Sequence, residues 1–220
     1  MKKSLTYKHE IKKTLNINIV EVLKRRLSLF MNIEKKEYIR DLYFDSPNNE
    51  DLIEKVNGEI VTEKFRIRYK NLDSTDIRLE KRMKKDGKYK KISAIITEED
   101  VENILNGDIE YLVFSYKKIL RDFYLNMICG KIEPKAIIEF ERESFTYKRA
   151  GITVNIDTSR KVSLNEEDIM DDKMKSVAIN EDTAVIEVRY NKDIPKFIDK
   201  LIFGDEENEE RRKSMWRFEI

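Results

Sequence analysis

The sequence predicts an α+β protein in which many antiparallel strands form a curled or closed sheet, with a few helices beside it. Three observations support this fold class. Apolar residues recur at every second position in most of the chain, which is the alternation of half-buried strands. Hairpin signatures are few, and closure of the sheet would remove exposed edges. With six Gly, three Pro and no low-complexity linker, residues 1–220 are expected to form a single domain.

About eight strands follow from this alternation. Each is a short run of alternating apolar and polar residues. The predicted strands are Tyr7–Leu15, Tyr38–Phe44, Glu59–Lys70, Asp76–Arg82, Tyr89–Ile96, Pro134–Phe145, Ile152–Thr158 and Thr183–Tyr190.

Helical spacing of apolar residues predicts a first and a last helix near the two ends of the chain. The first runs over about 18–31 and includes Phe30 among its apolar residues at helical spacing. The last starts near Pro195, a favoured residue for a first turn, and stops at Gly204. We expect Phe197 to be among its buried residues.

Two further helices are predicted in the middle of the chain. Thr97 followed three residues later by Asp100 resembles a capping box, which opens a short helix that ends at Gly107. A longer helix is expected over Leu112–Ile128, with Tyr116 on its apolar stripe.

Composition excludes several classes of function. The 44 Lys and Arg offset 43 Asp and Glu, so no overall field attracts nucleic acid or a membrane. Cys129 is the only cysteine, which excludes an intrachain disulfide and a cysteine-based zinc site and fits a reducing compartment. His9 is the only histidine and excludes a metal site built from several histidines. No stretch reaches the roughly 20 apolar residues of a membrane span, and no signal-peptide-like run follows the amino terminus, so we expect a cytoplasmic protein.

The segment KFRIRYK places four cations on one face of a strand, namely Lys64, Arg66, Arg68 and Lys70. Alternate residues of a strand lie about 7 Å apart, which is close to the repeat of phosphates along an extended chain. This row predicts binding of a polyanion.

Other strands also carry a charged face. The alternating sets are Glu10 with Lys12, Arg78 with Glu80 and Arg82, Glu139 with Glu141 and Glu143, Thr153 with Asn155 and Asp157, and Glu187 with Arg189. The solvated side of a sheet would explain any one of them. However, one strand holds four cations and another holds three carboxylates, and like charges at this spacing need a counter-charge. We therefore expect cations that bind phosphate and carboxylates that bind a hard divalent cation.

Arg66 and Arg68 are the strongest candidates, because no acid stands beside them on their own strand face. The basic run around Gly87 is most simply a solvated hairpin tip. Within it, Lys81 is a candidate to reach the phosphate-binding face of the sheet. Glu187 lies in the apolar run AVIEVRY, where a buried carboxylate needs a metal or an arginine. The chain has no Walker A sequence and no GxGxxG, so a P-loop or kinase site is excluded.

Eight motifs follow one another along almost the whole chain. They are KHEIKK (8–13), IRDLYFDSP (39–47), KFRIRYK (64–70), IRLEKRMKKDGKYKK (77–91), EPKAIIEFERESF (133–145), NID (155–157), IEVRYNKDIPKFI (186–198) and RKSMW (212–216). Their order resembles the VTC domain family of polyphosphate polymerases, in the triphosphate tunnel metalloenzyme superfamily. The resemblance implies an eight-stranded antiparallel barrel that transfers the γ-phosphate of ATP onto a growing polyphosphate chain, with manganese or magnesium as cofactor. ATP and inorganic polyphosphate are the partners implied, and not nucleic acid.

Together, the resemblance and the charged faces indicate three groups of site residues. The expected catalytic residues are Arg66, Arg68, Lys81 and Glu187. The expected phosphate-binding residues are Lys12, Lys64, Arg78, Lys90 or Lys91, Arg142, Arg189 and Ser214. The expected metal ligands are Glu187, Glu10, Glu139 and Glu141.

Two positions depart from the family pattern. Met215 follows Ser214 where the family commonly has Lys, and Thr153 stands where the family has Arg. Loss of two cations would weaken the hold on a long polyanion or alter the step that moves it. Two alternatives therefore stay open: a hydrolase of tripolyphosphate or nucleoside triphosphates with the same fold, and a module that binds polyphosphate without turnover.

Overall fold

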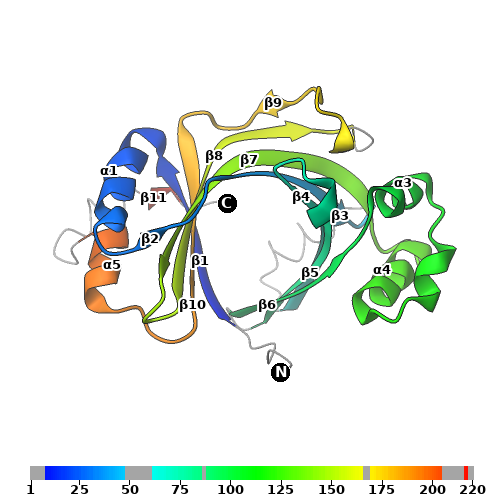
Figure 1. The fold of residues 1–220 in the computed structure, drawn as a ribbon, viewed down its shortest axis with the longest axis horizontal. Coiled ribbons are helices and arrows are strands. Elements are labelled where there is room, and N and C mark those ends of the chain that lie inside the picture. The colour runs from blue at the N-terminus through cyan, green and yellow to red at the C-terminus, as the bar shows by residue number, and fades with distance from the viewer. Residues whose placement is uncertain (1–7, 48–60, 86–87, 166–168, 205–215, 218–220) are drawn as a thin grey trace. The chain divides into compact units, whose positions relative to one another are not determined.

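The computed structural model describes residues 8–47, 61–85, 88–165, 169–204 and 216–217 (Figure 1). Its strands are β1 (Lys8–Asn16), β2 (Asn32–Ile33), β3 (Glu37–Asp45), β4 (Val61–Lys70), β5 (Arg78–Lys85), β6 (Lys88–Ile95), β7 (Glu133–Tyr147), β8 (Ile152–Ser163), β9 (Val177–Ala178), β10 (Thr183–Tyr190) and β11 (Trp216–Arg217). Its helices are α1 (Ile17–Ser28), α3 (Glu98–Asn106), α4 (Lys118–Ile128) and α5 (Lys196–Phe203), with short 3₁₀ turns η1 (Ser74–Asp76) and η2 (Glu110–Phe114).

Strand pairing closes the sheet on itself. The order runs β7-β3-β4-β5-β6-β1-β10-β8, and β8 also pairs with β7. The predicted eight-stranded antiparallel barrel with flanking helices is therefore confirmed. Strands β2, β9 and β11, of two residues each, were not predicted.

The chain divides into two compact units, each assembled from segments that are distant in sequence. Unit 1 contains residues 38–139 and 161–177, and unit 2 contains residues 7–37, 140–160 and 178–220, with the gaps given above. The single domain over 1–220 stays a prediction.

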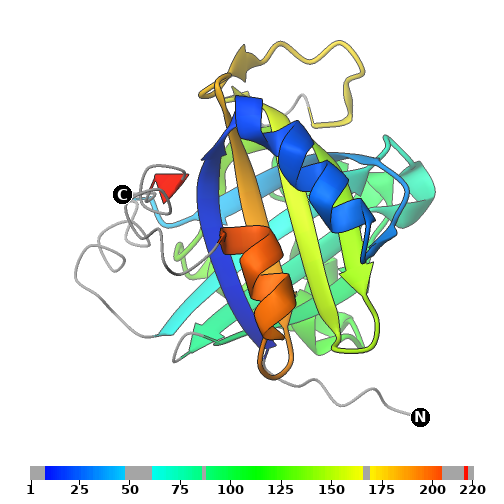
Figure 2. The ribbon, with the colours of Figure 1, turned by 90° about the vertical axis from the view of Figure 1, so that its left-hand side faces the viewer.

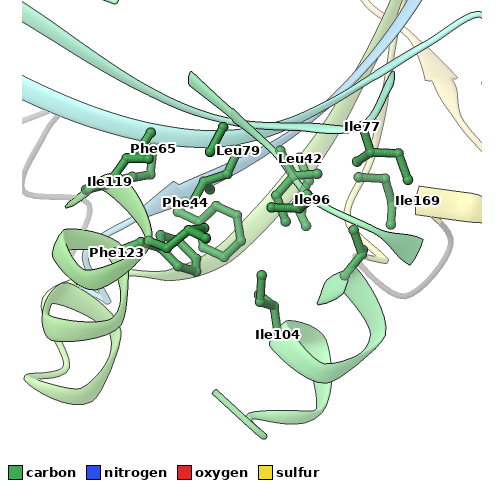
Figure 3. Close-up of a cluster of buried hydrophobic side chains, with 14 of the residues drawn as sticks. Leu42, Phe44, Phe65, Ile77, Leu79, Ile96, Ile104, Ile119, Phe123 and Ile169 are labelled. Atoms are coloured by element: carbon green, nitrogen blue, oxygen red, sulfur yellow. The ribbon is translucent and has the colours of Figure 1, made fainter. Parts of the chain in front are cut away.

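In unit 1, one face of strands β3 to β6 packs against the helices α3 and α4 (Figure 3). The β3–β4 register places Leu42 opposite Ile67 and Phe44 opposite Phe65, and all four are buried. From α4, the ring of Phe123 meets Phe44 edge to face, with centroids 4.9 Å apart. Because alternate strand residues point to opposite faces, the polar residues between these form the other face of the sheet.

The helices of unit 1 differ in one respect from expectation. The Thr97–Asp100 capping box opens α3 as predicted. The expected helix over Leu112–Ile128 is instead the turn η2 followed by α4, with extended backbone at Ser115 between them. The hydroxyl of Ser115 accepts from the backbone N–H of Lys117 at 3.2 Å, a local hydrogen bond that competes with a continuous helix. Tyr116, expected on the apolar stripe of one helix, lies between η2 and α4 and is 88% exposed.

In unit 2, the helices α1 and α5 lie side by side against β1, β10 and β8 (Figure 2). Alternate residues of the strands, among them Leu15, Val154 and Ile186, pack against Leu23 and Ile198 of the helices. The helix α1 begins after Asn16, whose side-chain oxygen accepts from the N–H of Asn18 at 2.9 Å.

Two aromatic residues expected at apolar helical positions lie outside this core. The helix α1 ends at Ser28, three residues earlier than predicted, so Phe30 falls beyond the helix and is 52% exposed. On α5, Ile198 and Ile202 fill the buried stripe, which leaves Phe197 43% exposed. The prediction that Phe197 is buried was therefore wrong. Phe30, expected within the first helix, is exposed because the helix ends before it.

Candidate functional site

The charged face of unit 1 gathers side chains from four neighbouring strands. The register sets Arg66 opposite Tyr43 on β3 and opposite Glu80 on β5, and it sets Arg68 opposite Asp41. Directly opposite residues of an antiparallel pair share a face. The unit 1 cluster defined here therefore comprises Asp41, Arg66, Arg68, Glu80 and, from β6, Lys91.

Asp41 joins the two arginines. Its carboxylate accepts from Nε and Nη2 of Arg68 at 2.7 and 2.6 Å, and from Nη1 of Arg66 at 3.1 Å. The residue is fully buried. Burial raises the pKa of this carboxyl group, but attraction to Arg66 and Arg68 outweighs that effect and holds the pKa below its ordinary value. Asp41 is thus the anionic centre to which both guanidinium groups are fixed.

Glu80 forms the second anionic centre of the cluster. One carboxylate oxygen accepts from Nε of Arg66 at 2.8 Å, and the other accepts from Nζ of Lys91 at 2.6 Å. Burial raises the pKa of Glu80, yet Arg66, Arg68 and Lys91 together hold it well below its ordinary value. The five side chains therefore carry three positive charges and two negative ones.

Sequence reasoning missed Asp41. The sequence does contain a signal for this residue, because Asp41 lies within the half-apolar strand IRDLYFD. A carboxylate in such a strand is costly to bury unless a cation pairs with it. The counter-charge that the cation row requires thus comes from the neighbouring strands β3 and β5.

The structure separates the lysines predicted for this site by strand face. Lys91 is opposite Arg82 and belongs to the charged face, whereas Lys90 is opposite Met83 on the other face. Lys81 is also on the other face, opposite Phe65, with Nζ 2.7 Å from Glu63 and 3.8 Å from Asp122 of α4. The structure therefore does not bring Lys81 or Lys90 to the arginines.

Two further members of the predicted phosphate-binding set lie on the charged face of unit 1. Lys64 is opposite Arg82. Arg78 is opposite Arg68 and pairs with Asp76 at 2.6 Å at a position about one third exposed.

Unit 2 has its own charged face, on β1, β10 and β8. The register sets Lys12 and Asn155 opposite Glu187, and it sets Glu10 opposite Arg189. These five residues are defined here as the unit 2 cluster. Glu187 is buried, accepts from Nδ2 of Asn155 at 2.9 Å, and pairs with Nε of Arg189. The same Nε lies 3.4 Å from Glu10, so two carboxylates share one guanidinium.

The unit 2 cluster offers hard oxygen donors for a divalent cation. Across the described ranges, no group of three or more His, Cys, Asp or Glu side chains is arranged to hold a metal. Magnesium, however, commonly binds through one or two carboxylates and completes its shell with water and substrate phosphates. Glu187 and Glu10 fit a cation held in that manner.

The two other expected metal ligands lie elsewhere. On β7, Glu141 accepts from Lys36 at 2.9 Å and shares its strand face with Phe145, which packs under the helices of unit 2. It is therefore on the opposite face from Glu187. Glu139, in unit 1, accepts from Tyr38 and, at 2.7 Å, from Ser176. Glu141 is therefore not beside Glu187 in unit 2, and Glu139 belongs to unit 1.

Arg142 is the remaining described residue of the phosphate-binding set. Its Nε and Nη2 donate to the carboxylate of Asp157 at 2.6 and 2.7 Å, and both residues are buried in unit 2. Ser214 and Met215 lie outside the described residues.

The family model of the VTC domain matches residues 2–216 of the chain. The chain belongs to the VTC domain family. Among solved structures, a putative adenylyl cyclase from Hippeastrum with a dominant triphosphatase activity is 14% identical, with a TM-score of 0.57 over 96% of this chain and 90% of that one. A putative adenylate cyclase from Bacillus halodurans is 12% identical, with a TM-score of 0.54 over 97% of this chain and 95% of that one. At this identity the two structures support the fold alone. No curated protein gave a significant match.

Within the VTC domain, one position that departs from the family pattern is described. Thr153 is directly opposite Arg189 on the charged face of unit 2. Arg189 contacts both Glu187 and Glu10. Among the described residues, no helix is long and apolar enough to cross a membrane.

Proposed function

We propose that this VTC domain is a polyphosphate polymerase that transfers the γ-phosphate of ATP to a growing polyphosphate chain, with Mn²⁺ or Mg²⁺. The observation that carries the proposal is the unit 1 cluster, in which Arg66, Arg68 and Lys91 outnumber two buried carboxylates. Phosphoryl transfer depends mostly on positioning and charge neutralisation, which such a cluster provides. Membership of the family supports the choice of substrate.

Arg66 and Lys91 are assigned the direct phosphate contacts in unit 1. Their side chains are 13% and 35% exposed. The side chain of Arg68 is only 4% exposed, and two of its nitrogens donate hydrogen bonds to Asp41. A guanidinium binds phosphate oxygens through two parallel hydrogen bonds, and an ammonium acts as a point charge. Arg68 is assigned the role of fixing Asp41, and through it Arg66.

Glu187 and Glu10 of the unit 2 cluster are assigned to the metal. The divalent cation would neutralise phosphate oxygens on which charge develops during transfer. Lys12, opposite Glu187 in the register, is assigned a phosphate contact. Arg189 neutralises the two carboxylates and holds them on one face.

A hydrolase differs from the polymerase in its acceptor, because water receives the phosphoryl group. A binding module transfers no phosphoryl group at all. Incubation of the purified protein with ATP and Mn²⁺, followed by gel separation, distinguishes long polyphosphate, free phosphate and unchanged ATP. Long polyphosphate is the expected product, and either other outcome overturns the polymerase assignment.

The variant Glu187→Gln tests the metal assignment against a matched control. Both Glu187 and Glu141 were expected ligands, yet they lie on opposite strand faces of unit 2. We expect Glu187→Gln to lower turnover about 100-fold, and Glu141→Gln to leave it near that of the unmodified protein. Calorimetric titration with Mn²⁺ should show the same contrast. Equal effects of the two substitutions would overturn the assignment of Glu187.

A further inference from the structure

Four large apolar side chains are exposed around the end of α1, on β2 and at the start of α5. Leu29 is 75% exposed, Phe30 52%, Ile33 61% and Phe197 43%. They are defined here as the α1–α5 patch. Exposed single apolar residues are ordinary, but a contiguous group marks an interaction surface.

Ring contacts and strand pairing make this patch contiguous. The rings of Phe30 and Phe197 meet at 6.0 Å between centroids, and Phe197 meets Tyr147 at 5.7 Å. Ile33 of β2 is directly opposite Phe145 of β7, so it shares the face on which Phe145 packs against the helices. The patch therefore joins the end of α1, β2 and the start of α5.

Basic residues surround the patch. The segments 25–36, 145–151 and 192–200 contain nine Lys or Arg but only three Asp or Glu, although the whole chain has a net charge of +1. All nine of these cations are exposed, among them Arg25 and Arg26 in the last turn of α1, Lys148 and Arg149 after Tyr147, and Lys196 next to Phe197 in the sequence. Glu141 and Glu143 of β7 share this face and pair with Lys36 and Lys24, respectively. The remaining cations leave an excess of positive charge, which complements a negatively charged partner.

Unit 1 provides a contrast. Phe114 and Tyr116 are each 88% exposed, more than any residue of the α1–α5 patch. Their segment 98–122, however, contains seven Asp or Glu and three Lys or Arg. The combination of apolar and basic side chains therefore distinguishes the unit 2 surface.

We propose that the α1–α5 patch docks onto the surface of an anionic phospholipid bilayer. Phe30, Leu29, Ile33 and Phe197 would enter the interface between head groups and acyl chains, while the surrounding Arg and Lys contact lipid phosphates and keep their stems along the apolar boundary. Anionic lipid attracts basic residues only within about a Debye length, so docking requires both elements at once. This proposal does not rest on the polymerase assignment.

Co-sedimentation of the full chain with lipid vesicles tests the proposal. We expect binding to vesicles of phosphatidylcholine and phosphatidylserine, and no binding to phosphatidylcholine alone. The bound fraction should rise with the content of phosphatidylserine and fall with added salt. Removal of Arg25 and Arg26 in the double variant R25A/R26A should weaken binding about 30-fold, at about fivefold for each cation.

A matched pair of substitutions separates insertion from simple attraction. Phe30→Ser should weaken vesicle binding about tenfold, whereas Phe114→Ser, at a more exposed phenylalanine in an acidic segment, should leave it unchanged. Polyphosphate synthesis in solution should be unaffected by either, which keeps this test separate from that of the proposed function. Absence of binding to the anionic vesicles, or equal effects at Phe30 and Phe114, overturns the proposal. Loss of binding in R25A/R26A but not in Phe30→Ser also overturns it, because the surface would then attract polyanions without docking.

Discussion

Arg68 holds the buried carboxylate of Asp41 through two hydrogen bonds of 2.7 and 2.6 Å, one to each oxygen. The same carboxylate accepts from Arg66 at 3.1 Å. The cation row on β4 is therefore anchored by an acid from β3. A phosphate ligand meets guanidinium groups that are already oriented, which lowers the entropy lost on binding.

The buried pair should matter far more to stability than an exposed pair of the same type. Asp41→Asn leaves Arg68 buried without its counter-charge, so we expect a loss of about 3–5 kcal/mol in the free energy of unfolding. The matched control is Asp76→Asn, since Asp76 pairs with Arg78 at a partly exposed position and its loss should cost less than about 1 kcal/mol. Urea unfolding measures both. A loss of unfolding free energy in Asp41→Asn as small as that in Asp76→Asn would show that the Asp41 contacts contribute little.

Lys91 and Lys90 should differ in their effect on polyphosphate binding. Neighbours in sequence, they lie on opposite faces of β6, and Lys91 alone joins the unit 1 cluster. We expect Lys91→Ala to weaken the affinity for short polyphosphate about tenfold, the value of one charge-assisted contact. Lys90→Ala should not change it. Calorimetric titration with short polyphosphate measures both affinities. A larger loss of affinity in Lys90→Ala than in Lys91→Ala would contradict the assignment of the two lysines to opposite faces of β6.

Acid should destabilise unit 1 through Asp41 and Glu80. The folded-state pKa of each lies below its ordinary value of 3.8 or 4.5, so the unfolded chain takes up protons first as the pH falls. Their contribution is therefore complete at neutral pH and is lost progressively below about pH 4.5. Urea unfolding measured between pH 7 and pH 3 should show this decline. In Asp41→Asn the decline should be shallower, and an unchanged slope would exclude Asp41 as a source.

Arg40 should hold the segment around Ile169 onto unit 1. Its Nη1 donates to the carbonyl oxygens of Ile169 and Asp171 at 2.8 and 2.9 Å. Arg40→Met removes both hydrogen bonds while keeping an apolar stem, and we expect a loss of about 3 kcal/mol in local stability. Hydrogen exchange of a peptide covering residues 169–176 should accelerate, while that of α1 in unit 2 should not. Unchanged exchange in residues 169–176 would contradict this role.

Period-two patterning predicted about eight strands in a curled or closed sheet, because one-sided burial forces apolar and charged residues to alternate along a strand. The closed eight-stranded barrel was implied by the resemblance to the VTC domain. All eight long strands were predicted, and the Thr97–Asp100 cap was visible as a local pattern. Helix ends were less accurate. Phe30 and Phe197 fit a helical stripe, yet the end of α1 and the packing of α5 leave both exposed, since tertiary contacts decide which part of a stripe is covered.

By itself the sequence determined that Arg66, Arg68 and Glu187 are charged residues of half-buried strands, and that the chain resembles the VTC domain. Only the tertiary structure decided which charges meet. Strand register places Asp41 and Glu80 against the arginines and selects Lys91 over Lys90. The packing of Phe145 under the unit 2 helices places Glu141 on the face opposite Glu187. The physical reason is that alternation assigns a residue to a face of its own strand, whereas its counter-charge comes from a neighbouring strand whose pairing the alternation does not specify.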